Sequence, residues 1–333
     1  MATMQDVADL AGVTKQTVSN VLSGRVAVRP ATEARVREAI AELGYVPNLV
    51  ARSLATGSTR TVGLFVPTVS TAFYAELVEE AEDVLGEHGY RLLLCTTRRD
   101  GERARRHLAG LTSRSVDALL IAGDEGLTDH LPLLSRTRFP VVLCAWEGAR
   151  APARFPVVTI DYEHGGYLAG RHLRDLGHEN VAVLAGPAHM MRVSGFRRAF
   201  AEDGLDVPDS AVRLVPEPSL KGGIAAAAEA MTARPAATAL FATHDVLAVG
   251  ALQAAQDKGC SIPADLSIVA HDDTPEGPLT RPALTSVALP TREMTREAIG
   301  LLLGAVSGAP SDAPHRRLLL PRLIVRDSTA PPA

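Results

Sequence analysis

The residues best suited to recognition chemistry lie near the start of the chain, between Val13 and Leu22. Lys15, Gln16 and Asn20 share one face of the helix that this stretch predicts, since Gln16 and Asn20 stand four residues apart. Lysine can donate to the acceptors of guanine, while glutamine and asparagine can bond adenine through two atoms at once. The stretch therefore carries side chains suited to reading base edges in DNA.

The neighbouring elements would hold such a helix in place. Thr14 is placed to cap its first turn. Upstream, the motif Thr3-x-x-Asp6 opens another short helix, which Gly12 ends. Two short helices joined by such a turn predict a helix-turn-helix, and Thr32–Leu43 predicts a third helix that completes a small core. A plain helical hairpin with a solvated polar face is the alternative. The apolar face of the second helix is predicted by Val18, Val21 and Leu22.

Charge is unevenly distributed along the 333 residues, whose net charge is −4. Residues 1–60 hold seven basic and five acidic side chains, so the positive excess lies at the helix-turn-helix end. A head of charge +2 predicts weak, salt-dependent binding of DNA by one head alone. Two paired heads would bind more strongly.

Composition indicates an ordinary globular protein, with 46% hydrophobic and 22% charged residues. No apolar run is long enough to span a membrane, and no secretory signal precedes the first helix. The cysteines are odd in number and scattered within apolar segments, which favours free thiols in a reducing compartment. We expect a cytoplasmic protein without membrane contact. These cysteines are Cys95, Cys144 and Cys260.

Beyond Arg60, apolar strands alternate with amphipathic helices, which predicts parallel sheets covered on both faces. About 270 residues of this pattern exceed one open sheet and predict two lobes with a cleft at the strand ends. The expected strands are 62–66, 91–96, 118–122, 141–145, 157–160, 181–185, 239–242, 267–270, 286–288 and 318–325. The expected helices include 73–88, 162–176, 195–203, 223–231, 245–258 and 292–306.

An enzyme is the main alternative within this core. His244-Asp245 and His271-Asp272-Asp273 could act as metal ligands or acid–base pairs. However, the chain lacks HExxH, GxSxG, a P-loop and GxGxxG, and no Cys/His spacing suits zinc. We therefore expect no enzyme, no metal and no cofactor.

Residues 1–57 resemble the DNA-binding head of LacI/GalR-type repressors through the words DVADLAGV, TVSNVLSG, AIAELGYVPN and ARSLATG. The resemblance implies that Lys15, Gln16 and Asn20 read the major groove. It implies that Leu54 wedges into the minor groove, where an apolar side chain can kink DNA by unstacking one base step. The head would span 1–45 and the hinge 46–60. Phosphates would contact Thr14, Thr17 and Ser19, and the hinge would touch DNA through Asn48, Ala51 and Leu54.

The rest of the chain resembles the family's effector core, which is built like periplasmic sugar-binding proteins. The matching words include VGLFVPTVSTAFYAELVEEAEDVLGEHGY, DYEHGGYLAGRHLRDLGHENVAVLAGP and FATHDVLAVGAL. The implied fold is a small all-α helix-turn-helix domain followed by a bilobal α/β core with two parallel-sheet lobes. The core would span 61–327, with a first lobe of about 61–160 and 291–317, a second of about 161–288 and 321–327, and a tail at 328–333.

The resemblance also implies an effector site in the cleft. Its expected contacts are Phe73, Trp146, Asp161, Arg192, His244, Asp245 and Asp272. The chain departs from the family pattern where Ala145 replaces an aspartate and where Pro218 replaces a stacking aromatic. Asp245 could instead cap a helix. We expect a missing acceptor at Ala145, with Trp146 or Phe73 as the replacement platform.

These features together predict a ligand-responsive repressor. It would bind a near-palindromic double-stranded operator as a homodimer and take a small polar effector, a sugar derivative first and a nucleoside or other metabolite second. A small-molecule binding protein without a DNA role is the alternative function.

Overall fold

The computed structural model describes residues 2–23, 26–46, 53, 57–111, 115–123, 131–134, 137, 139–147, 154–233, 236–308 and 316–332. The chain separates into two compact units, Met1–Thr59 and Arg60–Ala333. Among the described residues, no helix is long and apolar enough to cross a membrane.

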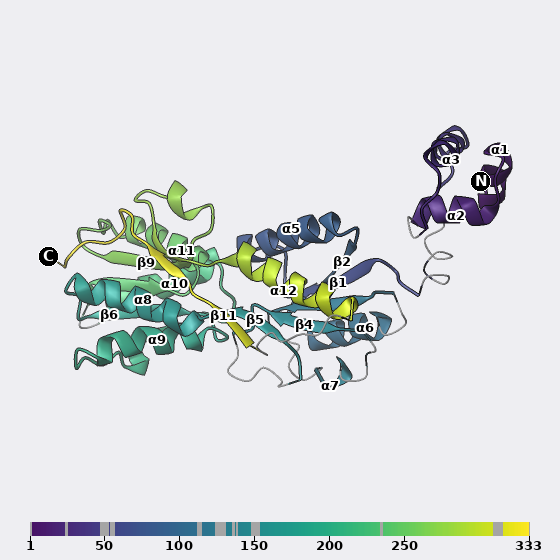
Figure 1. The fold of residues 1–333 in the computed structure, drawn as a ribbon. Coiled ribbons are helices and arrows are strands. Elements are labelled where there is room, and N and C mark those ends of the chain that lie inside the picture. The colour runs from purple at the N-terminus through teal and green to yellow at the C-terminus, as the bar shows by residue number, and fades with distance from the viewer. Residues whose placement is uncertain are drawn as a thin grey trace. The chain divides into compact units, whose positions relative to one another are not determined.

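The described residues of the first unit form three helices around a small apolar core (Figure 1). A capping box starts the first helix, in which Thr3 accepts a hydrogen bond from the Asp6 amide and returns one to the Asp6 carboxylate. Thr14 caps the second helix by accepting from the Thr17 amide at 3.2 Å. The predicted helix-turn-helix is confirmed. The helices are α1 (Met4–Leu10), α2 (Lys15–Ser23) and α3 (Pro30–Glu42).

The second unit begins with a six-stranded sheet in the order β11-β5-β4-β3-β1-β2, with parallel neighbours throughout. Helices α5 and α12 pack on one face of this sheet, and α6 and α7 on the other (Figure 1). We call this part the first lobe. Its strands are β1 (Thr61–Val66), β2 (Arg91–Thr96), β3 (Ala118–Ala122), β4 (Val141–Cys144), β5 (Val157–Ile160) and β11 (Arg316–Leu319); its helices are α5 (Ala72–Glu87), α6 (Gly101–Leu111), α7 (Leu131–Leu134) and α12 (Thr291–Val306).

A second six-stranded sheet, in the order β12-β10-β9-β8-β6-β7, forms the second lobe. Only β12 runs antiparallel to its neighbour within the described sheet. Helices α10 and α11 cover one face, and α8 and α9 the other. The strands are β6 (Val181–Ala185), β7 (Val212–Leu214), β8 (Ala239–Ala242), β9 (Ser267–Asp272), β10 (Thr285–Ala288) and β12 (Arg322–Ile324); the helices are α8 (Tyr162–Asp175), α9 (Met190–Ala201), α10 (Leu220–Thr232), α11 (Asp245–Asp257) and the short 3-10 turns η2 (Asp209–Ala211) and η3 (Gly277–Leu279).

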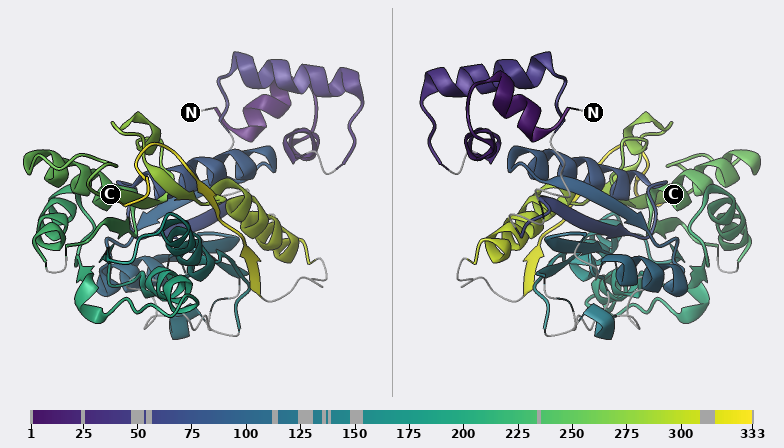
Figure 2. Two further views of the ribbon diagram at one scale, coloured as in Figure 1. Left: turned by 90° about the vertical axis from the view of Figure 1, so that its left-hand side faces the viewer. Right: turned by 90° about the vertical axis from the view of Figure 1, so that its right-hand side faces the viewer.

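The C-terminal strand expected at 318–325 is in fact two strands in different sheets. β11 ends at Leu319 in the first lobe, and β12 begins at Arg322 in the second. Pro321 lies between them, and proline has no N–H for a continuous ladder. Figure 2 shows this yellow stretch passing from one lobe to the other. The sequence pattern also missed α6, α7 and β7.

The approach of α8 to α9 depends on two glycines. A Cβ on Gly166 would lie 1.8 Å from the Arg192 carbonyl oxygen, and one on Gly195 would lie 1.7 Å from the Glu163 carbonyl oxygen. Neither position can hold a side chain without moving a helix backbone. This close contact fixes α9 and therefore the point from which Arg192 extends.

Candidate functional site

The first candidate surface is the polar side of α2. Lys15 and Gln16 are exposed and Asn20 is half-buried, whereas Val18 on the opposite side is completely buried. The Gln16 amide donates to Asn20 Oδ1 at 3.1 Å, so these side chains lie together. A helix that presents such donors and acceptors can dock in a major groove.

The residues expected against phosphates lie on the same helix or at its start. The Thr14 and Thr17 hydroxyls are 3.0 Å apart, and Ser19 is half-buried. The positive end of a helix dipole favours anions near Thr14 and Thr17, in the first turn of α2. The hinge contacts remain predictions, because Asn48, Ala51 and Leu54 lie outside the described residues.

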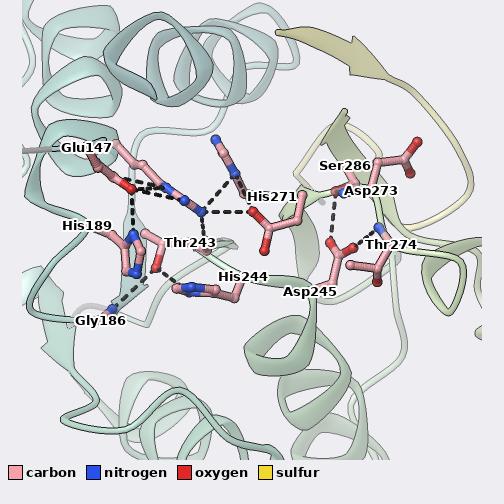
Figure 3. A network of polar contacts seen from close by, with 12 residues as sticks. Glu147, Gly186, His189, Thr243, His244, Asp245, His271, Asp273, Thr274 and Ser286 are labelled. Atoms are coloured by element: carbon pink, nitrogen blue, oxygen red, sulfur yellow. Dashed lines mark hydrogen bonds and ion pairs between the residues drawn. The ribbon is translucent and has the colours of Figure 1, made fainter. Parts of the chain in front are cut away.

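The second candidate site lies where β4, β6, β8 and β9 end (Figure 3). Carboxyl ends of parallel strands are the usual place for ligands in open α/β sheets. Both lobes contribute, since β4 belongs to the first sheet and the other strands to the second. We call the following residues the interlobe cluster: Glu147, His189, Arg192, Thr243, His244, His271 and Asp272.

Arg192 is the centre of the interlobe cluster and is only 4% exposed. Its Nε and Nη2 donate to the Glu147 carboxylate at 3.1 and 3.0 Å. Its Nη1 donates to Asp272 Oδ1 at 3.0 Å and to the Thr243 carbonyl oxygen at 2.5 Å. The guanidinium carbon lies 4.8 Å from the centre of the Tyr162 ring. Two carboxylates, one from each lobe, thus pair with a single buried cation.

Glu147 was missed by the sequence analysis, and the expectation that no acceptor follows β4 is wrong. The chain turns at Ala145, which has a φ of 50°, and Trp146 then packs into the first-lobe core at 1% exposure. The Thr159 hydroxyl donates to the Trp146 carbonyl oxygen at 2.9 Å. These contacts direct Glu147 toward the second lobe. Trp146 itself is too enclosed to offer an open stacking face in this conformation.

Three histidines surround the arginine and its acids. His189 Nδ1 lies 2.7 Å from Glu147 Oε2. The His189 and His244 rings meet edge to face, with centroids 4.2 Å apart. His271 Nδ1 lies 3.1 Å from Asp272 Oδ1, and no partner is found for its buried Nε2 among the described residues. Two of the histidines therefore contact the acids of the cluster, and the third packs against His189.

Burial lowers the pKa of His189 and His271 well below the usual range, and the Arg192 guanidinium lowers both further. Burial likewise lowers the pKa of His244, and the neighbouring His189 lowers it further. Burial raises the pKa of Glu147 although Arg192 opposes this. At pH 7 the three imidazoles are neutral, so each can offer one donor and one acceptor. Among the described residues, no three His, Cys, Asp or Glu side chains are placed to hold a metal ion.

Asp245, an expected effector contact, faces a backbone turn. It is 3% exposed, and its carboxylate accepts from the Thr274 amide at 2.5 Å and from the Ser286 hydroxyl at 2.9 Å. Burial raises the pKa of Asp245 to about 7, with the Asp272 carboxylate the next cause. Figure 3 shows Asp245 beside the interlobe cluster, between Thr274 and Ser286.

Two further expected contacts lie outside the interlobe cluster. Asp161 caps α8, because its Oδ1 accepts from the His164 amide at 2.9 Å. Phe73 lies near the start of α5, half-buried and edge-on to Tyr74 at 5.0 Å between ring centroids. The structure therefore brings together Arg192, His244 and Asp272 from the expected set.

Glu147, His189 and Thr243 are the cluster members that sequence reasoning did not name. A usable signal existed for Glu147, since an acid closely follows a buried strand whose end faces the cleft. His189 carries no such signal, because it lies in a loop before α9 and becomes meaningful only through its contact with Glu147.

Comparison with known proteins finds a matching family model in each of the two units. A family model described as bacterial regulatory proteins, lacI family, matches residues 3–48, and a periplasmic binding protein-like domain matches residues 171–329. Catabolite control protein A of Priestia megaterium is 34% identical over 324 residues, which cover 94% of this chain and 97% of that protein.

Two solved structures share the whole architecture. A complex of the transcriptional regulator CelR with cellobiose has 32% identity and a TM-score of 0.74, covering 98% of this chain and 100% of that one. The lac repressor dimer bound to operator and the anti-inducer ONPF has 26% identity and a TM-score of 0.86, covering 99% of each chain.

CelR is a transcriptional regulator and the lac repressor binds an operator, which confirms the expectation that this chain is not an enzyme. The head, the core and their order all match along nearly the entire length. With a helix-turn-helix unit followed by two periplasmic-binding-protein-like lobes, the chain belongs to the LacI family of bacterial regulatory proteins and is a DNA-binding regulator of transcription.

Proposed function

We propose that this protein is a cytoplasmic, homodimeric repressor that binds a near-palindromic operator and responds to a small polar effector at the interlobe cluster. The observation that carries the proposal is the bridge from Glu147 in the first lobe to Arg192 in the second. A ligand that competes with or adds to this bridge binds some lobe arrangements better than others. Such differential binding is what couples a ligand to a conformational change.

A sugar derivative is the first candidate for the effector and a nucleoside or other metabolite the second. Neutral imidazoles supply both donors and acceptors, while Asp272 supplies acceptors that can bind hydroxyl groups. The cellobiose complex of the relative CelR favours the sugar. Whether the effector releases DNA or promotes its binding depends on which lobe arrangement it prefers, since linkage permits either sign.

A homodimer is supported by the apolar edge of the first-lobe sheet. β2 is an edge strand on which Leu93 and Leu94 are each 38% exposed. Exposed apolar edge strands favour association. Analytical ultracentrifugation of the Leu93→Lys/Leu94→Lys variant should give monomers. Leu214→Lys, on the opposite lobe's edge strand β7, is the matched control and should remain dimeric; equal behaviour of both variants would contradict this interface.

Operator recognition is tested first, by selecting from random double-stranded DNA with the full chain. The expected product is a motif of two halves related by a two-fold axis, because two identical heads read two half-sites. Enrichment of single half-sites without two-fold symmetry would contradict the reading of one operator by two paired heads.

Effector binding is tested next, by the melting temperature of the full chain with cellobiose, ribose or adenosine. A compound that binds the folded state raises this temperature by mass action. It should then change the affinity for the selected operator. His244→Ala should weaken the response, whereas His88→Ala, an exposed histidine after α5, should not. A compound that binds without changing operator affinity would contradict the coupling, and absence of a response to all three compounds would count against both effector classes.

A further inference from the structure

The turn after β9 holds two consecutive non-glycine residues in the left-handed region. Asp272 has a φ of 111° and Asp273 a φ of 55°. Residues with a Cβ rarely adopt this region, and they persist there only when surrounding contacts hold them. The contacts that hold this turn are therefore part of how the site is built.

Asp245 holds the two backbone amides that follow Asp272, those of Asp273 and Thr274. Its Oδ2 accepts from the Thr274 amide at 2.5 Å, and its Oδ1 accepts from the Ser286 hydroxyl at 2.9 Å. The Ser286 oxygen accepts in turn from the Asp273 amide at 3.1 Å. One carboxylate thus fixes two successive backbone N–H groups, one directly and one through a hydroxyl.

A second set of contacts anchors the far side of the turn. Arg326 donates to Asp273 Oδ1 at 2.6 Å and to the Leu284 carbonyl oxygen at 2.7 Å. The Gly277 amide donates to the Thr274 carbonyl oxygen at 3.0 Å. These contacts restrain the turn but do not reach the Asp273 and Thr274 amides, which depend on Asp245 and Ser286.

The turn presents the Asp272 carboxylate to the interlobe cluster, where Oδ1 accepts from Arg192 at 3.0 Å. Asp245 and Ser286 are more deeply buried than Asp272, with exposed fractions of 3% and zero. Both Asp245 oxygens already have partners in the turn and β10. Asp245 is therefore placed to act on the site through Asp272.

We propose that Asp245, together with Ser286, is a positioning residue that holds the left-handed turn at Asp272–Asp273 and so sets the Asp272 carboxylate against Arg192. Its bearing on the effector rests on the function proposed above. It differs from the direct effector contact that sequence resemblance implies for Asp245.

The first test measures hydrogen exchange at the Asp273 and Thr274 amides in the effector-free full chain. Asp245→Asn should speed exchange by about tenfold or more, since asparagine keeps only one of the two acceptor oxygens that hold the Thr274 amide directly and the Asp273 amide through Ser286. Ser286→Ala should speed exchange mainly at Asp273, and Ser286→Thr, which keeps the hydroxyl, should restore it. Unchanged exchange in Asp245→Asn would overturn the proposal.

A matched control uses another aspartate that holds a turn in the same lobe. The Asp265 carboxylate accepts from the Ser261 amide at 2.7 Å. Asp265→Asn should speed exchange at Ser261 and leave Asp273 and Thr274 unaffected. Faster exchange at all these amides in either variant would indicate general destabilisation of the lobe and would overturn the proposed role.

The decisive test is rescue by glycine. Asp273→Gly removes the Cβ that resists a φ of 55°. It also removes the Arg326 contact, so Arg326→Ala, which loses that contact and keeps the Cβ, is the matched background. The readout is the NMR signal of the Arg192 guanidinium in arginine-labelled protein, which reports contact with Asp272. Asp245→Asn should shift this signal in the parent chain and in the Arg326→Ala background, and the shift should shrink to less than about half in the Asp273→Gly background. Equal shifts in the Asp273→Gly and Arg326→Ala backgrounds would overturn positioning through the turn.

These measurements need no effector, so their outcome is separate from that of the proposed function. A negative response to cellobiose, ribose and adenosine would count against the effector classes while leaving the turn result intact. Unchanged exchange and an unshifted Arg192 signal would overturn the positioning role alone.

Discussion

The two recognition surfaces of this molecule are built in opposite ways. On α2, Lys15 and Gln16 are exposed, and the Gln16–Asn20 hydrogen bond links two residues of one helix. In the interlobe cluster, Arg192 is buried and binds acids that come from 45 and 80 residues away in sequence. One surface is open to its partner, whereas the other is occupied by its own side chains.

This difference has an energetic consequence. Removing the partner of an exposed polar side chain costs little free energy of unfolding, because water replaces the partner. A buried charge that loses its partner keeps its desolvation penalty and has nothing to offset it. Substitutions on α2 should therefore change DNA reading with little change in stability, while substitutions in the cluster should change both stability and function.

The largest effect is expected for Arg192→Ala. It leaves the Glu147 and Asp272 carboxylates buried without their cation, which costs about 3–5 kcal/mol of unfolding free energy for a buried pair. Loss of this cation should remove the effector response proposed above. The burial of Arg192 now predicts a lower free energy of unfolding as well, measured by denaturant titration.

The double variant Arg192→Ala/Glu147→Gln provides the control. Removing one unpaired acid should recover part of the lost stability, because the two residues interact directly. If Arg192→Ala unfolded at the same denaturant concentration as the parent, the buried network would contribute nothing and the contrast with α2 would fail.

The contrast also explains what the sequence could predict. The helix-turn-helix was readable because its signals are local: the Thr3 capping motif, the Thr14 cap and the spacing of Val18, Val21 and Leu22. The alternation of strands and helices gave the layered core in the same way. Arg192 and Asp272 were found through family resemblance. Their contact arises only when α9 and β9 assemble in one lobe.

The unpredicted part depends on three-dimensional detail. No local pattern marks Asp245 as a support for the turn at Asp273, since that role depends on Ser286 from another strand. Nor does sequence show that Trp146 is enclosed while Glu147, the next residue, crosses to the other lobe. These two adjacent side chains point in different directions, and only that of Glu147 reaches Arg192.

The second prediction is loss of stability on acidification. Folding lowers the pKa of His189, His244 and His271. As the pH falls below the ordinary pKa of histidine, the unfolded chain therefore binds more protons than the folded chain does. Their contribution is present above pH of about 6.5 and is lost as pH falls through the lower folded pKa values. Each such group changes stability by up to about 1.4 kcal/mol per pH unit in that window.

Two acids oppose this trend. Folding raises the pKa of Glu147, and that of Asp245 to about 7, so each adds stability below its unfolded pKa and loses it as pH rises. Three cluster histidines against two acids predict a net fall in melting temperature between pH 7 and 5.5. Asp245→Asn removes one opposing group and should steepen the fall. A melting temperature that rose over this interval would contradict neutral buried imidazoles.

A smaller effect is expected on the DNA surface. Gln16→Ala removes a side chain able to contact a base edge and should cost about 1–3 kcal/mol at one or two operator positions. Its melting temperature should stay close to that of the parent. Binding to the selected operator and to single-base variants measures both affinity and preference. Gln5→Ala, an exposed glutamine on α1, should leave the preference intact; an equal loss on random DNA would make Gln16 a phosphate contact.

The smallest effect is expected for Arg37→Ala, and it separates burial from charge as the cause of the contrast. Arg37 and Glu33 form an ion pair of 2.6 Å on α3, shorter than any Arg192 contact with an acid, yet their side chains are 68% and 40% exposed. An exposed pair one helical turn apart contributes only about 0.3–0.5 kcal/mol, because water and salt screen it. Denaturant titration at low and high salt should find a loss within that range that shrinks further as salt rises. A loss comparable to that of Arg192→Ala would mean that ion-pair length, rather than removal from water, sets the energetic difference between the two regions.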